Sequence, residues 1–361
     1  MRVLIVADDL TGALDAAVPF ADHRMNTCVL RDARSFSQLD LHGIDVCAVS
    51  TGSREGHADA ALATIDHVLA ALPIQRPEII FKKVDSRLKG HVALETVRLA
   101  SGTNREKILI APAIPDMGRV VENRQITGMG IASPISIAGL FANNECDVAI
   151  PDTQSHADFH NILERFDPRH TLYTGARGLA AALAEKLGGS QQKKAITLPC
   201  PALFAIGSRD PITLKQVESL MNAQKPALIE APNGDFPASH TLDARLTLTQ
   251  LTKGAHEIAA DCAGQVFAYS LYKFIAENPP ATLLACGGET ASALFKRLSI
   301  ERLDLVCEIL PGVPLAEAKI GDKMTRIITK SGGFGDADTL LHLANCLKSV
   351  KIAPEQAGSA T

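Results

Sequence analysis

Tryptophan is absent from this sequence of 361 residues, and aromatic residues make up only 4% of it. Few side chains are therefore available to stack on nucleic-acid bases. A basic stripe is missing too, because the 36 lysines and arginines are scattered along the chain and the net charge is -4. Proteins that bind nucleic acids or anionic membranes usually concentrate positive charge. Both absences argue against a nucleic-acid or membrane partner.

Long apolar runs are also missing. No stretch approaches the roughly 20 residues of a membrane span, and the short run 3–6 turns acidic at Asp8 and Asp9. A signal peptide requires a longer apolar segment and a small-residue cleavage site, so this run predicts a strand. The eight cysteines show no C-x-x-C spacing, and buried, reduced thiols explain them best. We therefore expect a cytoplasmic protein.

What remains is the composition of an ordinary globular protein, with 46% hydrophobic and 21% charged residues. Its length favours about two domains. Short β-branched runs alternate with helical patterns, which predicts an α/β fold of two domains, each built on a mainly parallel sheet with flanking helices. The expected strands are 3–6, 28–30, 46–50, 79–84, 107–111, 145–150, 203–206, 227–230, 282–286, 303–308 and 326–329. The expected helices are 13–21, 58–72, 156–165, 178–187, 212–221, 242–274, 289–298 and 338–347.

Two stretches interrupt this alternation. Between 112 and 137, proline, glycine and asparagine dominate without clear periodicity, which is typical of a functional loop. Between 188 and 194 the chain is polar and starts with two glycines, which indicates a domain boundary. We therefore expect one domain at 1–195 and a second at 196–361, with a short disordered tail from 354.

Charged side chains follow three expected strands of the first half. Ligands bind at the carboxyl ends of parallel strands, so these residues are expected to share one edge of the sheet. Carboxylates there can orient or deprotonate a hydroxyl, and arginine can hold a substrate carboxylate through two hydrogen bonds. Helix capping or a solvated loop would explain one such cluster, but three together favour a site. The candidates are Asp8, Asp9, Arg54, Lys83, Asp85, Ser86 and Arg87.

Glycine-rich turns follow three expected strands of the second half. A single glycine pair often serves only the geometry of a turn. Three of them favour a phosphate site, because backbone N–H groups and helix N-termini bind anions. The candidate nucleotide-binding residues are Ser208, Gly287, Gly288, Glu289, Thr290, Gly332, Gly333, Phe334, Gly335 and Asp336.

Several common motifs are absent. The sequence has no G-x-x-x-x-G-K-[ST], and Gly128-Met129-Gly130 lacks the third glycine of a dinucleotide fingerprint. Leu10 stands where the aspartyl-phosphate phosphatases have their second aspartate. His156 and His160 lie four residues apart, but no third ligand accompanies them. We therefore predict no protein-bound metal site.

Four strings of this sequence resemble the four-carbon acid sugar kinases: Ala7–Ala13, Lys83–Gly90, Gly287–Ala291 and Lys330–Gly335. They also occur in the same order as in that family, and the resemblance extends from Met1 to about Leu347. Members usually have threonine in place of Arg87, asparagine in place of His91, and a second serine in place of Arg209 and Asp210. The additional Arg87 widens the range of acids to be considered.

The resemblance implies an ATP-dependent kinase that phosphorylates a hydroxyl of threonate, erythronate or a related oxo or branched acid such as 3-oxo-isoapionate. In that family the N-terminal domain holds the acid and the C-terminal domain holds ATP. The active site is then expected in the cleft between the domains, with Mg²⁺ accompanying ATP. Asp85 or Asp9 would act as the general base, and Arg54 with Arg87 would hold the acid's carboxylate.

Two other functions remain open at this stage. A phosphatase or aldolase acting on a phosphorylated sugar acid would use the glycine turns for substrate phosphate and would need no nucleotide. A sensor would bind ATP and a sugar acid without turnover. For the oligomeric state, a homodimer is one option.

Overall fold

The computed structural model describes residues 1–73, 76–142, 144, 146–191 and 196–348, so the expected tail from 354 lies outside the described residues. The chain packs as two compact units. Unit 1 comprises Met1–Lys194 and Phe295–Lys319, and unit 2 comprises Ala195–Leu294 and Ile320–Thr361. The segment Phe295–Lys319, which the sequence placed in the second domain, therefore packs with unit 1.

Unit 1 contains a mainly parallel sheet in the order β17-β16-β2-β3-β1-β4-β10-β5-β9. Strand β16 pairs in antiparallel fashion with its neighbours β2 and β17. The strands are β1 (Val3–Ala7), β2 (Thr27–Leu30), β3 (Val46–Ser50), β4 (Ile79–Lys83), β5 (Lys107–Ala111), β9 (Asp147–Ala149), β10 (Thr171–Gly175), β16 (Arg302–Leu310) and β17 (Val313–Ile320). The central strands β1, β3 and β4 are buried along their whole length, so the sheet forms the core.

Helices flank this sheet in two groups. Helix α1 (Leu10–Asp22) packs against α6 (Arg177–Leu187), which also contacts α5 (His156–Arg165). In the other group, α2 (Ala58–Ala70) packs against α3 (Val92–Gly102). Shorter helical turns complete the unit: η1 (Ala33–Ser37), η2 (Pro115–Met117) and α4 (Ile137–Leu140).

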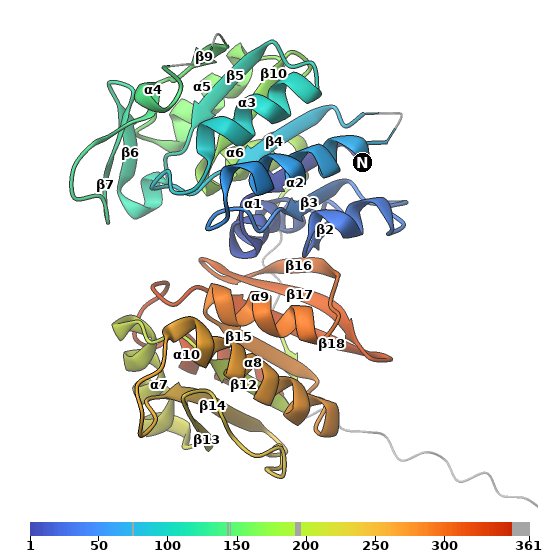
Figure 1. Ribbon diagram of the computed structural model, residues 1–361, viewed down its shortest axis with the longest axis vertical. Helices are drawn as coiled ribbons and strands as arrows, with labels where there is room; N and C mark the ends of the chain where they lie inside the picture. The colour runs from blue at the N-terminus through green and yellow to red at the C-terminus, as the bar shows by residue number, and fades with distance from the viewer. Residues whose placement is uncertain (74–75, 143, 145, 192–195, 349–361) are drawn as a thin grey trace, which may run out of the picture. The chain divides into compact units, whose positions relative to one another are not determined.

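The stretch 112–137 is not without regular structure. It contains a small antiparallel sheet of β6 (Arg119–Glu122), β7 (Gln125–Gly128) and β8 (Ile135–Ser136) (Figure 1). The two residues between β6 and β7, Asn123 and Arg124, have φ angles of 51° and 61°. Positive φ at both positions is the geometry of a two-residue hairpin turn, which usually requires glycine second. Arginine in that position concealed the hairpin in the sequence.

Unit 2 contains a parallel sheet in the order β13-β14-β12-β15-β18. Its strands are β12 (Ala202–Ile206), β13 (Ala227–Pro232), β14 (Leu246–Thr252), β15 (Thr282–Cys286) and β18 (Lys323–Lys330). Its helices are α7 (Pro211–Gln224), α8 (Ala260–Glu277), α9 (Gly288–Arg297) and α10 (Thr339–Asn345). The short strands β11 (Leu198–Pro199) and β19 (Leu347–Lys348) pair separately. An α/β fold with mainly parallel sheets is thus confirmed.

The helix expected over 242–274 is wrong in its first half. Residues 246–252 form β14, which lies between β13 and β12, and the helix α8 begins only at Ala260. Leucine and the β-branched threonine alternate from Leu246 to Thr249. Period-two alternation of this kind favours a strand over a helix. The sequence analysis also missed β10, β17 and α3.

The cysteines have a more varied environment than expected. All eight are free. Cys28, Cys47 and Cys286 are buried, but Cys262 is exposed on α8. Within the described residues, no helix is long and apolar enough to span a membrane.

Candidate active site

Strands β3, β1 and β4 are neighbours in the sheet of unit 1, so their carboxyl ends adjoin. This arrangement brings together the three charged clusters that follow them. The Arg54 guanidinium donates from Nε and Nη2 to the two oxygens of Asp8, at 2.9 and 2.8 Å. Its Nη1 donates to Asp9 at 2.7 Å and lies 3.9 Å from Asp85 Oδ2. One arginine therefore joins three carboxylates from two strand ends.

The electrostatics of this cluster depend on its burial. Burial alone would raise the pKa of Asp8, but the hydrogen bonds from Arg54 and the charges of Lys82, Arg54 and Lys83 lower it. Burial would lower the pKa of Arg54, and here the hydrogen bonds and charges of Asp8, Asp9 and Asp85 raise it instead. Asp8 is therefore a fixed anion and Arg54 a fixed cation at neutral pH.

Asp9 is the N-cap of α1, and both of its oxygens are occupied. Oδ1 accepts from the Gly12 N–H, and Oδ2 accepts from the Thr11 hydroxyl as well as from Arg54, each at 2.7 Å. Gly12 must stay without a side chain, because a Cβ there would lie 2.4 Å from Asp9 Oδ1 and 3.1 Å from Lys83 Nζ. The buried Lys83 donates to the Val84 carbonyl. Asp9 thus has little capacity left to accept a proton.

Asp85 has a freer carboxylate. Its Oδ1 accepts from the Arg87 N–H at 2.8 Å and stabilises the turn after β4, whereas its Oδ2 lies 3.9 Å from Arg54 Nη1. Ser86 is half-buried and Arg87 is exposed. Of the predicted carboxylates, Asp85 therefore has the oxygen best able to accept a hydrogen bond from a ligand.

A buried network beneath this edge was missed by the sequence analysis. The side chains of Lys82 and Glu95 are 0% and 1% exposed and form an ion pair at 2.7 Å. Glu95 also accepts a short hydrogen bond from the Ser53 hydroxyl, which contacts Thr51. The pair therefore supports the loop that carries Arg54. Glu95 belongs to α3, which was not predicted, so nothing indicated that it faced β4.

Strands β12, β15 and β18 are neighbours in unit 2, and their glycine-rich turns adjoin in the same way. A Cβ on Gly207 would lie 1.9 Å from Thr290 Oγ1, and one on Gly332 would lie 2.1 Å from Ser208 Oγ. Gly287 and Gly335 have φ angles of 111° and 86°, where glycine is strongly preferred. The glycines therefore let three backbone segments approach closely at one edge.

Three polar residues that the sequence analysis did not select hold the last glycine turn. Thr213 donates to the Gly332 carbonyl at 2.7 Å, and Gln216 donates to the Phe334 and Asp336 carbonyls at 3.0 and 2.7 Å. The Lys330 ammonium donates to the Ser331 and Gly332 carbonyls. Burial lowers the pKa of Lys330, and the charges of Cys286 and Asp210 oppose this effect. With its carbonyls bound, the turn is held in one conformation.

The remaining predicted residues of unit 2 lie at helix starts. Gly288 and Glu289 are in the first turn of α9, where N–H groups lack partners within the helix. Asp336 accepts from Asp338 N and Thr339 Oγ1, each at 3.0 Å, and so stabilises the start of α10. Gly333 is exposed and Phe334 half-buried. The residues predicted in unit 2 therefore lie in the turns after β12, β15 and β18 or in the helices that follow these turns.

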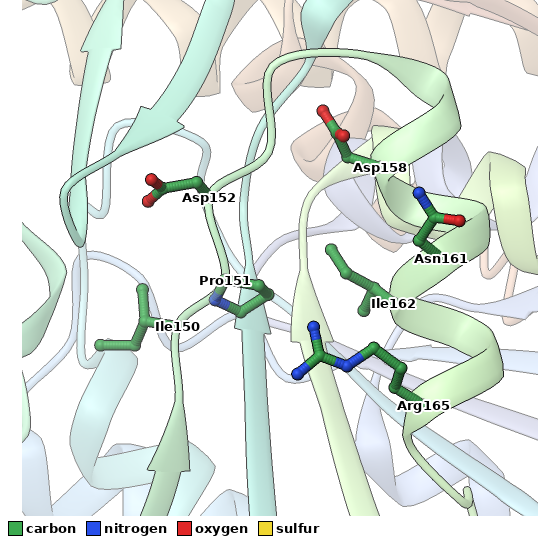
Figure 2. Close-up of a pocket in the computed structure, with 7 residues that line it drawn as sticks. All are labelled: Ile150, Pro151, Asp152, Asp158, Asn161, Ile162 and Arg165. Carbon is green, nitrogen blue, oxygen red and sulfur yellow. The ribbon is translucent and has the colours of Figure 1, made fainter.

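A separate hollow of about 480 Å³ lies beside α5 (Figure 2). Figure 2 shows Asp152, Asp158 and Arg165 around Pro151. Asp158 is already bound in the capping box of α5, and the Gln154 N–H is the main cause that lowers its pKa. None of the predicted site residues lines this hollow. Across the described ranges, no group of three potential metal ligands occurs, and His156 pairs with Asp116 instead.

One sheet edge of this protein is thus rich in carboxylates and arginine, and another gathers three glycine-rich turns. Residues 3–135 match a family model described as a sugar-binding N-terminal domain, and residues 229–340 match one described as a nucleotide-binding C-terminal domain. The chain belongs to the four-carbon acid sugar kinase family. The resemblance noted in the sequence is thus confirmed.

Two relatives illustrate the similarity. A D-threonate kinase from Bordetella bronchiseptica is 28% identical, over 95% of this chain and 97% of its own. A 3-oxo-tetronate kinase from Pseudomonas fluorescens is 24% identical, over 92% of this chain and 94% of its own. Both matches span nearly the whole of each chain.

Two solved structures share the fold. A Salmonella typhimurium protein described as a putative tRNA synthase superposes with a TM-score of 0.72, at 19% identity over 94% of this chain and 98% of its own. A Haemophilus influenzae protein from a family of unknown function gives 0.70, at 19% identity over 95% and 99%. At these identities the likeness shows the fold alone.

Proposed function

We propose that this protein is an ATP-dependent kinase that phosphorylates a hydroxyl of a short-chain sugar acid. The proposal rests on one observation: the chain has two sheet edges of different chemistry, one in each unit. The edge of unit 1, with Asp8, Arg54 and Asp85, lies within the match to the sugar-binding model. The turns after β15 and β18 lie within the match to the nucleotide-binding model. Threonate, erythronate and oxo acids of the same length are the candidate substrates.

At the first edge, Asp85 accepts the proton of the attacking hydroxyl. Its Oδ2 has free lone pairs, whereas both oxygens of Asp9 are occupied. A general base must lie within hydrogen-bond reach of the proton it accepts. Asp8, Asp9 and Arg54 keep this edge in one geometry, and Lys83, Ser86 and Arg87 complete the acid site. A cleft between the two domains stays a prediction.

At the second edge, the glycine turns fit nucleotide phosphates. A Cβ at Gly207 would collide with the Thr290 side chain and one at Gly332 with the Ser208 side chain, so glycine keeps these turns closely packed. The first turn of α9 has N–H groups without partners within the helix, which can bind an anion. Ser208, Gly287–Thr290 and Gly332–Asp336 would hold ATP. Magnesium in kinases is held largely by the phosphates with one or two carboxylates, and Asp210 and Asp336 are the carboxylates at hand. When bound, Mg²⁺ neutralises charge on the transferring phosphoryl group.

The test is ADP release from Mg-ATP with a panel of four- and five-carbon aldonic and oxo acids. The kinase predicts ADP with one or two acids and none without an acid. Acid-phosphate breakdown without nucleotide would instead establish a phosphatase or aldolase. ATP and acid binding without ADP would establish a sensor. The location in the cytoplasm and a homodimer remain predictions from the sequence.

Replacing Gly332 by alanine is expected to weaken ATP binding by about 1–3 kcal/mol, the usual cost of forcing a methyl group into a packed site. The new Cβ would lie 2.1 Å from Ser208 Oγ and 3.3 Å from Asp210 Cβ. The KM for ATP should rise, and the KM for the acid should stay within about twofold. Gly264→Ala is the matched control, because α8 leaves open space at that position. Equal ATP affinity of both variants would contradict a phosphate site at this turn.

A further inference from the structure

Arg119, the first residue of β6, is a buried cation held by neutral groups. It is 7% exposed. Its Nε and Nη2 donate to the Met129 carbonyl at 3.0 and 2.7 Å, and its Nη1 donates to the Ser86 hydroxyl. A guanidinium has five N–H bonds, so two of them have no partner in the part of the chain that the structure describes. No carboxylate in that part pairs with it either.

A second cation lies next to it. Arg87 follows Ser86, the residue that Arg119 contacts, and Arg87 is exposed. Burial lowers the pKa of Arg119, the positive charge of Arg87 lowers it further, and Asp85 opposes both. Two like charges brought together beside a desolvated group cost free energy unless an anion joins them. The arrangement therefore fits a ligand that supplies negative charge.

The hairpin of β6 and β7 places Arg119 in this position. Arg119 is paired with Gly128, where a Cβ would lie 1.9 Å from the Gly118 carbonyl oxygen. This close approach puts the Met129 carbonyl beside the guanidinium. A Cβ at Gly130, whose φ is 75°, would lie 3.3 Å from Arg119 Nη2, so glycine at this position leaves room beside that nitrogen. The Gly128-Met129-Gly130 string, which is no dinucleotide motif, thus has a role in presenting Arg119.

The obvious alternative cation is Arg54, which the sequence favoured for binding the acid. Its Nε, Nη1 and Nη2 all donate to Asp8 and Asp9. Two carboxylates already neutralise this guanidinium and occupy its donors, so it attracts a third carboxylate only weakly. We propose that Arg119 and Arg87, with Ser86, bind the carboxylate of the sugar acid, and that Arg54 positions the aspartates. This assignment rests on the proposed function and names the residues that select an acid over a neutral polyol.

The experiment compares wild type, Arg119→Gln, Arg119→Lys and Arg87→Gln in ADP release with threonate, erythronate and the neutral tetritol erythritol. Arg119→Gln should raise the KM for the acid roughly 10–100-fold, as expected for losing hydrogen bonds to a charged group. Its KM for ATP should be unchanged, and its preference for acid over erythritol should disappear. Arg119→Lys keeps the charge without the fork and should retain part of that preference. Arg87→Gln should lower the preference less, because Arg87 is exposed.

Arg105→Gln is the matched structural control. Arg105 also donates to backbone carbonyls, those of Pro77, Glu78 and Arg169, and burial lowers its pKa too. It precedes β5 and so lies at the amino end of the sheet. A merely structural Arg119 would behave like Arg105, with a lower melting temperature and an unchanged preference for the acid, and this result would overturn the proposal.

Calorimetric titration with threonate separates this proposal from the kinase activity. One outcome is that wild type releases no ADP but binds threonate, and that Arg119→Gln loses this binding while Arg105→Gln keeps it. This outcome would support the carboxylate site and contradict the kinase activity. If wild type is an active kinase and Arg119→Gln has the same KM for the acid, the kinase activity is supported and the proposed carboxylate site is contradicted. If wild type neither turns over nor binds any of the acids, both are overturned.

Discussion

Replacing Asp85 by asparagine is expected to lower kcat by about 10²–10⁴-fold, the usual contribution of a well-placed general base. Asparagine has no basic oxygen to take the proton of the attacking hydroxyl. It can still accept the Arg87 N–H that Asp85 Oδ1 now accepts at 2.8 Å, so the turn after β4 should persist. Steady-state ADP release with the best acid measures kcat, and the melting temperature checks that the variant is folded.

Asp9→Asn is the control for this prediction. Asparagine caps a helix about as well as aspartate, so the bond from the Gly12 N–H should survive. Because both oxygens of Asp9 already accept hydrogen bonds, its loss should reduce kcat much less than the loss of Asp85. Near-normal turnover of Asp85→Asn together with a slow Asp9→Asn would assign the proton transfer to Asp9 instead.

Replacing Arg54 by alanine is expected to lower the free energy of unfolding by about 3–5 kcal/mol at neutral pH, as found when one partner of a buried ion pair is removed. The side chains of Arg54 and Asp8 are 19% and 3% exposed. Without the guanidinium, Asp8 would be a buried carboxylate that has lost both hydrogen bonds from Arg54. Urea unfolding of wild type and variant at pH 7 measures the difference.

The difference in unfolding free energy between wild type and Arg54→Ala is expected to depend on pH. In wild type the pKa of Asp8 lies below its ordinary value of 3.8, so its stabilising effect is present above pH 3.8 and is lost as the pH falls through the lowered pKa. In the variant, burial dominates and raises that pKa, so protonation relieves the penalty as the pH falls. The difference in stability should therefore shrink between pH 7 and about pH 4.

Two further variants make the result specific. Asp8→Asn in the Arg54→Ala background removes the buried charge and should restore part of the lost stability. Arg98→Ala removes an exposed arginine paired with Asp66 and should leave the unfolding midpoint unchanged. A loss for Arg54→Ala that is the same at both pH values and is not relieved by Asp8→Asn would contradict the role given to this ion pair.

Several features of the fold could be predicted from the sequence because they depend on local patterns. Residues 46–50, 107–111 and 282–286 were predicted as strands with the bounds that β3, β5 and β15 have. Each is a compact apolar or β-branched run between turns, and such a run has few alternatives to a buried strand. The Asp210–Pro211 pair is a local helix-start signal of the same kind, and α7 begins at Pro211.

Other features could not be predicted because the deciding contacts are distant in the sequence. The local alternation from Leu246 to Thr249 covers only part of β14, and pairing with β12 and β13 defines the whole strand Leu246–Thr252. Asn123 and Arg124 both have positive φ angles in the turn, and their sequence lacks the glycine that usually indicates such a turn. No sequence pattern singled out Arg119, because its contact with Ser86 depends on where the hairpin lies relative to the end of β4.

By itself, the sequence determined that charged residues and glycine turns follow the strands of two α/β halves, because each depends on neighbours within a few residues. It also identified the family, since four strings occur in a fixed order. Only the tertiary structure decided which charges meet. The order β3-β1-β4 pairs Arg54 with Asp8 and Asp9 and leaves an oxygen of Asp85 free. A hairpin inserted after β5 brings Arg119 to Ser86, the residue before Arg87, and strand order and insertion result from packing across the whole unit.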